Sequence, residues 1–184
     1  MTTQSLMTSL STLSPHRENR LQLTQQVIEN GDIENLFAIC LKVESPYHTK
    51  AWWILEWVLA SDREYLLTYG PLIVRKMTLI KEESALRPMV KILCSWTKSQ
   101  IKNDAIAIPQ QDMDTMIESG FDWLITDVQV AIKVHAMEML SLIMKWNDWI
   151  IHPLADVLSK GIQEHSPAYK ARASKILKKI KKQI

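Results

Sequence analysis

Two stretches decide the fold: VAIKVHAMEMLSLI at residues 130–143 and PAYKARASKILKKI at residues 167–180. Aligned without gaps, they share Lys, Ala, Leu and Ile at their fourth, seventh, eleventh and fourteenth positions. The shared Ala and Leu follow the shared Lys by three and seven residues, a spacing that places them on one face of an α-helix. Each stretch is therefore predicted to be an amphipathic helix with one buried stripe.

The same pattern occurs twice earlier, as YHTKAWWILEWVLA at residues 47–60 and SALRPMVKILCSWT at residues 84–97. The four stretches align on a column of basic residues with spacings of 37, 46 and 37, namely Lys50, Arg87, Lys133 and Lys170. Another apolar helical pattern precedes each stretch, at residues 32–43, 63–80, 110–125 and 148–162. Helix pairs repeating at about 40 residues are typical of α-helical solenoids, in which stacking buries what one pair cannot.

Boundary signals agree with these helices. Ser45-Pro46 and Ser166-Pro167 have the order of an N-cap followed by a proline in the first turn. Asp62 is predicted to cap the helix that starts at residue 63. Gly31 is predicted to end an additional leading helix at residues 18–30.

A family resemblance follows from these residues. Residues 126–140 (TDVQVAIKVHAMEML) resemble the second helix of a HEAT repeat, with a loop acid followed by V-x-x-x-V-x-A-x-x-x-L, and residues 166–180 are similar. The resemblance covers residues 32–180 and extends to short bacterial HEAT-like proteins. Trp53 and Pro88 depart from the pattern. The resemblance implies an all-α fold, an armadillo-type α-α superhelix of about four helical hairpins plus the leading helix. It implies no particular activity.

Composition agrees with an all-α protein. Only four Gly and seven Pro in 184 residues are few for a fold rich in tight turns. The Ser- and Thr-rich residues 1–15 are predicted to be a flexible lead-in without the features of a secretory signal, and residues 16–184 a single domain. Cys40 and Cys94 stand apart, which favours a reducing compartment, and we expect the cytoplasm. No apolar run is long enough to span a membrane.

The charge is uneven along the chain. Residues 160–184 hold eight Lys or Arg and one acid, a net charge of +7 in a chain whose formal net charge is +2. Such a basic end can attract nucleic acid, or it can be a solvated last helix. The basic column likewise allows a phosphate-binding ladder or structural pairing with acids, for which Asp62, Asp104 and Asp127 are available.

Seven tryptophans are a high number for this length. Trp53, Trp57 and Trp123 are expected in the core, because burial is the usual fate of aromatic residues at core spacing. Trp52 can lie on either side of its helix, whereas an exposed pair at Trp146 and Trp149 would indicate a binding surface. Glu56, between large apolar residues, is a candidate acid-base group if it is buried, or a polar-edge residue if it is not.

No catalytic motif, cofactor motif or metal-ligand spacing stands out, so no catalytic, cofactor-binding or metal-binding residue is assigned. The leading hypothesis is a non-enzymatic scaffold whose concave surface, lined by the second helices, binds a protein or peptide. The alternative is a nucleic-acid-binding protein, related in fold to the HEAT-like DNA alkylation-repair glycosylases. The candidate binding-surface residues are Trp52, Arg87, Lys133, Trp146, Trp149, Lys170 and Arg172.

Overall fold

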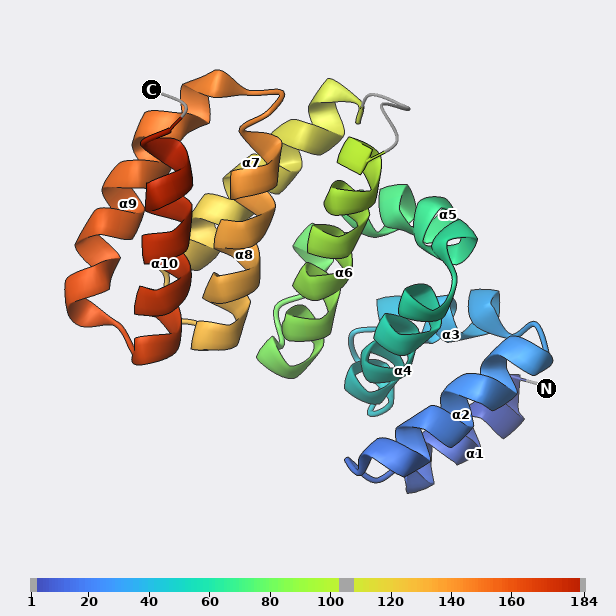
Figure 1. The fold of residues 1–184 in the computed structure, drawn as a ribbon. Helices are drawn as coiled ribbons and strands as arrows, with labels where there is room; N and C mark the ends of the chain where they lie inside the picture. The colour runs from blue at the N-terminus through green and yellow to red at the C-terminus, as the bar shows by residue number, and fades with distance from the viewer. Residues whose placement is uncertain (1–2, 103–107, 183–184) are drawn as a thin grey trace. The chain divides into compact units, whose positions relative to one another are not determined.

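The structure is a computed structural model that describes residues 3–102 and 108–182. Over these residues the chain has ten α-helices, two short 3-10 helices and no strand, and the helices pack against one another (Figure 1). The α-helices are α1 (Thr3–Thr12), α2 (Arg17–Glu29), α3 (Ile33–Leu41), α4 (His48–Ser61), α5 (Arg63–Val74), α6 (Glu83–Lys102), α7 (Gln110–Ile125), α8 (Val130–Ile143), α9 (Ile151–Glu164) and α10 (Pro167–Ile180). This confirms the all-α fold of packed helices that the repeat pattern predicts.

The helices fall into two compact units, Met1–Ile92 and Leu93–Ile184. Helices α1 to α5 belong to the first unit and α7 to α10 to the second, and the boundary between the units lies inside α6. Each unit has a packed apolar core of its own. The expectation of a single domain over residues 16–184 stays a prediction.

Helix α4 is the central helix of the first unit, because α2, α3 and α5 all pack against it. The side chains that meet there are fully or almost fully buried: Leu23, Val27, Leu36, Ile39, Ile54, Leu55 and Val58. Burying such aliphatic side chains contributes about 1.5–3 kcal/mol each relative to leaving them exposed. The packing of this apolar surface, and not helix propensity alone, holds the short helices in place.

The predicted stop at Gly31 is confirmed. Gly31 has φ 67°, the left-handed conformation that glycine adopts without steric cost. Its N–H donates to the Ile28 carbonyl at 3.1 Å, and the Asp32 N–H donates to the Val27 carbonyl at 2.9 Å. These two bonds form a Schellman motif, which ends α2 and lets α3 begin at Ile33.

The lead-in differs from the flexible segment expected for residues 1–15. Residues 3–12 form helix α1, and the side chains of Leu6 and Leu10 are fully buried. The two leucines are four residues apart and so lie on the same face of the helix. Burial of that face explains why a Ser- and Thr-rich segment with weak helix propensity is helical here.

Helix α6 accommodates Pro88 through a contact with α4. Proline has no N–H, so the Ser84 carbonyl four residues earlier has no donor within its helix. The indole Nε1–H of Trp53 donates to this carbonyl at 3.1 Å. At the start of the same helix, the Glu82 carboxylate accepts from the Ala85 N–H and the Thr49 hydroxyl, both at 2.9 Å. Partial burial alone would raise the pKa of Glu82, but hydrogen bonds from Ser84, Thr49 and Ala85 together outweigh it and lower the pKa.

In the second unit, α7 packs on α8, α9 packs on α10, and α8 lies beside α10 (Figure 1). Helices α8 and α10 are the two stretches that share the strongest repeat, and their predicted bounds agree with the structure. The alanines of the repeat, Ala136 and Ala173, are fully buried, as is Leu140. Small residues at this position let neighbouring helices approach closely, which is the packing that a helical repeat requires.

Candidate binding surfaces

Trp52 does not lie on a binding surface, and this prediction is wrong. Its side chain is only 1% exposed, and its Nε1–H donates to the Cys40 carbonyl at 3.1 Å. His48 Nδ1 donates to the same carbonyl at 2.6 Å. Cys40 lies at the C-terminal end of α3, where backbone carbonyls have no partner within the helix. Trp52 and His48 therefore satisfy the end of α3 from inside the core.

The prediction that Trp53 and Trp57 lie in the core is also wrong, because a different face of the helix is buried. The buried stripe of α4 runs through Ala51, Leu55 and Val58, and Trp52 belongs to it. Trp53 and Trp57 lie on the edge of this stripe and are half-buried. The Arg20 guanidinium lies 5.0 Å from the ring centroid of Trp53 and covers part of that ring. Trp123 of α7 is half-buried as well.

The basic column is not a phosphate ladder in the structure. Lys133, predicted as a binding-surface residue, is 5% exposed, and its Nζ donates to the Leu124 carbonyl at 3.0 Å, near the end of α7. Lys50 Nζ donates to the Ser11 carbonyl at 2.9 Å, near the end of α1. A cation is favourable at the negative end of a helix dipole, so both lysines act as C-terminal caps of another helix. Both hydrogen bonds are accepted by backbone carbonyls, whereas the alternative of structural pairing predicted acidic side chains as the partners.

The other two members of the column face solvent. Arg87 of α6 and Lys170 of α10 are exposed, and they remain candidates for a binding surface. Asp104, one of the acids considered as a partner for the column, lies outside the described residues. One column of basic residues thus contains two helix caps, of which Lys133 is buried and Lys50 half-buried, and two solvent-facing cations.

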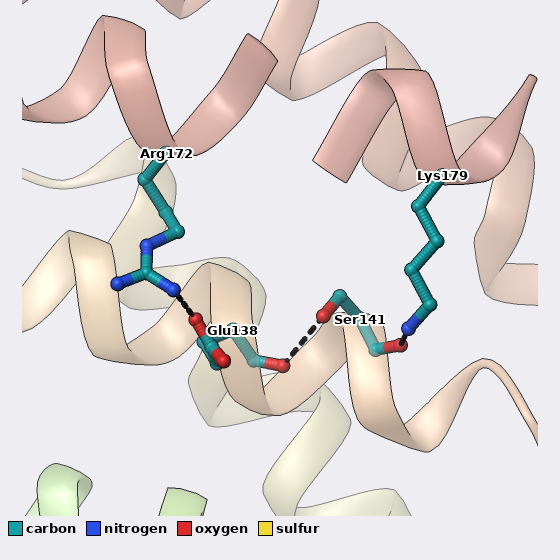
Figure 2. A network of polar contacts seen from close by, with 4 residues as sticks. All are labelled: Glu138, Ser141, Arg172 and Lys179. Atoms are coloured by element: carbon teal, nitrogen blue, oxygen red, sulfur yellow. Dashed lines mark hydrogen bonds and ion pairs between the residues drawn. The ribbon is translucent and has the colours of Figure 1, made fainter. Parts of the chain in front are cut away.

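Arg172 holds two repeats together. Figure 2 shows Glu138 and Ser141 of α8 facing Arg172 and Lys179 of α10. The Arg172 guanidinium forms an ion pair with the Glu138 carboxylate, and Lys179 Nζ donates to the Ser141 carbonyl at 2.7 Å. Burial lowers the pKa of Lys179, and the nearby charge of Lys145 lowers it further. Arg172, a candidate binding-surface residue, therefore already has an ion-pair partner within the protein.

A related ion pair links α4 to α6 in the first unit. The Lys91 ammonium contacts the Glu56 carboxylate, so two consecutive second helices are again bridged by an acid and a base. This contact accounts for an acid between the large apolar residues of α4. Glu56 lies at the polar edge of its helix, as the simpler of the two interpretations of this residue expects.

A lysine face remains on α10 after these contacts. It consists of five exposed side chains that the structure places on or just after this helix: Lys170, Lys175, Lys178, Lys181 and Lys182. At 100° per residue these positions cover about 140° of the helix surface, next to the side that carries Arg172 and Lys179. The lysine face is therefore contiguous and can contact an extended anion.

Trp146 and Trp149 are exposed, as a binding surface requires. Their side chains are 43% and 62% exposed, in the turn between α8 and α9. Lys145 and Asp148 beside them are exposed too. A solvated tryptophan leaves a large apolar surface in water, which makes such a pair a good anchor for a partner.

An open groove lies between α2, α4 and α5 in the first unit. It has a volume of about 420 Å³. Its lining residues are Leu21, Thr24, Gln25, Ile28, Glu29, Trp57, Ser61, Asp62 and Tyr65. Leu21 is 46% exposed, and Trp57, Tyr65 and Ile28 are half-buried, so the apolar wall is only partly covered by the described residues of the unit. We refer to this feature as the α2–α5 groove.

The α2–α5 groove was not predicted from the sequence, although α2 carries a signal for it. Leu21 and Ile28 are seven residues apart and form an apolar stripe separate from the buried Leu23 and Val27. Two stripes on one helix indicate contacts on two sides, and only one of them is filled in the structure.

The described residues contain neither a metal-ligand cluster nor a thiol activated by its surroundings. Among them no group of three or more His, Cys, Asp or Glu side chains is placed to hold a metal ion. Burial raises the pKa of the Cys94 thiol to about 11 and that of the fully buried Cys40 well above its usual value, so both thiols are poor nucleophiles at neutral pH. Within residues 3–102 and 108–182, no helix combines the length and the apolar character needed to cross a bilayer.

In comparisons with known proteins, no family model matches the chain, and no curated protein or solved structure matches it either. The binding surfaces therefore have to be interpreted from their own chemistry.

Proposed function

We propose that the protein is a non-enzymatic scaffold that binds a protein or peptide partner on the surface of its helices. The α2–α5 groove is the observation that supports this most strongly. Its volume of about 420 Å³ and its apolar and aromatic wall with a few polar groups have the character of a binding site. A helical repeat does not define a function by itself, so the proposal rests on this surface.

We also propose that the chain belongs with the HEAT-like helical repeats. The support is the contact of α8 with α10, in which the bonded residues are 34 and 38 positions apart, close to the sequence repeat of 37. The cytoplasm is the proposed location, supported by the two free cysteines, of which Cys40 is buried.

The proposal predicts that peptides selected for binding will use the α2–α5 groove. A random peptide library is displayed and selected against the immobilised full chain, and the enriched peptides are synthesised. Their affinity should fall by ~10-fold or more in Leu21→Glu, because an ionised side chain in the apolar wall of the groove must be desolvated on binding. Affinity is measured by fluorescence anisotropy.

Leu79→Glu is the matched control, since Leu79 is also an exposed leucine and does not line the groove. The same peptides should bind this variant like the wild type. A library that yields no peptide, or peptides that bind both variants equally, would refute the groove as the scaffold's binding site.

Nucleic-acid binding is the second candidate function, and the lysine face of α10 favours it. Together with Trp146 and Trp149 on the same unit, it offers cations for phosphates and rings on which bases can stack. If five phosphates are neutralised, affinity for single-stranded DNA should fall by about 10²-fold between ~50 and ~200 mM salt. Quenching of tryptophan fluorescence measures the binding.

A matched pair of double variants tests this second candidate. Lys175→Glu with Lys178→Glu should weaken DNA binding, whereas Lys76→Glu with Lys81→Glu removes the same charge from exposed positions of the first unit and should change it little. No binding at low salt, or equal weakening in both double variants, argues against this function.

A further inference from the structure

We propose that the α2–α5 groove binds a basic amphipathic helix. One apolar side chain of this helix lies in the groove, and a Lys or Arg one helical turn away lies at the acidic rim of the groove, formed by Glu29 and Asp62. The proposal rests on the scaffold function and names the chemistry of the partner. It follows from the charges of the groove, from the hydrogen bonds already made by its polar groups and from its uncovered apolar wall.

The titratable lining groups of the groove carry negative charge only, apart from Tyr65. Glu29 and Asp62 line it, and the lining includes no Lys, Arg or His. Arg63, which follows Asp62 in the sequence, is not part of the lining. An anion such as a phosphate group would meet repulsion here, whereas an ammonium or guanidinium group would be attracted.

In the part of the chain that the structure describes, the two carboxylates accept hydrogen bonds only from neutral donors. Glu29 Oε1 accepts from Gln25 Nε2 at 2.9 Å, and Asp62 Oδ1 accepts from the Glu64 N–H at 2.8 Å. Across residues 3–102 and 108–182, neither carboxylate takes part in an ion pair, and each has a second oxygen for a cation. The rim therefore has unused charge that a basic partner can neutralise.

The aliphatic hydroxyl groups of the groove, those of Thr24 and Ser61, are already engaged by their own helices. Thr24 donates to the Arg20 carbonyl at 2.7 Å, and Ser61 donates to the Val58 carbonyl at 2.7 Å. The groove thus offers apolar surface and carboxylates but few free groups for a peptide backbone. A helical partner suits such a groove, because its backbone hydrogen bonds are satisfied internally.

The apolar wall selects the position of the anchor. Leu21 and Ile28 from α2 face the groove together with Trp57 from α4, and all three keep solvent-accessible surface. An aliphatic or aromatic side chain placed there removes this surface from water. A Lys or Arg three or four residues along a helix lies on the same face as that anchor, within reach of the acidic rim.

Three fluorescein-labelled model peptides test the proposal against the full chain. Each has Leu at helical spacing along one face, with Lys, Gln or Glu at the flanking positions. The Lys peptide should bind at least ~10-fold more tightly than the Glu peptide at low salt, with the Gln peptide between them, because opposite charges attract and like charges repel at the rim. Affinity is measured by anisotropy.

Two pairs of variants localise the binding. Glu29→Gln should weaken the Lys peptide by ~3-fold or more, as expected for a partly exposed ion pair, whereas Glu44→Gln removes an exposed carboxylate outside the groove and should not. Leu21→Ser should weaken it by ~10-fold, whereas Leu79→Ser should leave it unchanged. Circular dichroism confirms that each variant is folded.

The outcomes separate this inference from the scaffold function. If the Gln or Glu peptide binds as tightly as the Lys peptide and Leu21→Ser still weakens it, the groove binds peptides but the basic partner is wrong. If the Lys peptide fails to bind while the display selection yields groove-dependent peptides, the inference is again wrong and the scaffold stands. If no peptide binds in either experiment, both are overturned.

Discussion

Replacing Trp52 by alanine is expected to lower the free energy of unfolding by about 3–5 kcal/mol, the usual range for removing a large buried aromatic side chain. The ring is 1% exposed at the centre of the first unit, so its removal leaves a cavity that α2, α3 and α5 cannot fill without moving. The variant also loses the hydrogen bond from Nε1 to the Cys40 carbonyl. Urea unfolding followed by circular dichroism measures the change.

Trp149→Ala is the matched control for this experiment. It removes the same atoms from a side chain that is 62% exposed, and its effect on stability should stay within about 0.5 kcal/mol. Trp52→Phe should lie between the two, because it keeps most of the apolar volume and loses the indole donor. A Trp52→Ala protein as stable as the Trp149→Ala protein would contradict the burial of Trp52.

Three helices of the second unit could be predicted residue by residue, whereas the pattern at 148–162 contains a short 3-10 helix followed by α9 at Ile151–Glu164. Helices α7, α8 and α10 begin and end where the apolar pattern and its boundaries place them, at 110–125, 130–143 and 167–180. Their apolar residues follow one stripe, and Pro167 in the first turn defines the start of the last helix. Where a single face is apolar and the ends are marked, local signals and tertiary packing agree.

The face of α4 could not be predicted in the same way. Its sequence is apolar at most positions between Ala51 and Leu59, so no single stripe stands out. Three helices pack around it, and the arrangement of those neighbours determines that Trp52 lies inside while Trp53 and Trp57 lie at the edge. Helix α1 was missed for a related reason, because the burial of Leu6 and Leu10 depends on tertiary contacts and not on propensity.

The same limit applies to the candidate sites. Lys133 and Lys170 occupy equivalent repeat positions, yet one caps a helix inside the unit and the other is exposed. Their different roles depend on whether a helix end lies within reach, which spacing along the chain does not report. The α2–α5 groove likewise arises from three helices, of which α2 precedes the four aligned repeat segments. The sequence did not predict that Trp146 and Trp149 are exposed; it indicated only that they would form a binding surface if they were.

Gly161 of α9 is expected to be the most constrained glycine of the second unit. A Cβ at this position would lie 2.6 Å from Tyr169 Cζ and 2.8 Å from Tyr169 Cε1, closer than van der Waals contact allows. Tyr169 is fully buried in α10, so its ring cannot swing into solvent. Glycine therefore sets how closely α9 and α10 approach each other.

Gly161→Ala should accordingly lower the free energy of unfolding by about 1–2 kcal/mol, since overpacking at so close a contact costs about 2–3 kcal/mol and exceeds the gain of about 1 kcal/mol in helix propensity. Gly120→Ala is the comparison and should cost less, because the nearest atoms there, in the Leu140 side chain, lie farther away, at 3.0 Å. In the described residues the buried Tyr169 hydroxyl has no hydrogen-bond partner, so Tyr169→Phe should not destabilise the protein and should relieve part of the Gly161→Ala loss. Urea unfolding of the four variants, including the double variant, measures this coupling. A Gly161→Ala protein at least as stable as the wild type would show that α9 and α10 can separate at little cost, and the close packing of the last helical pair would then not depend on glycine.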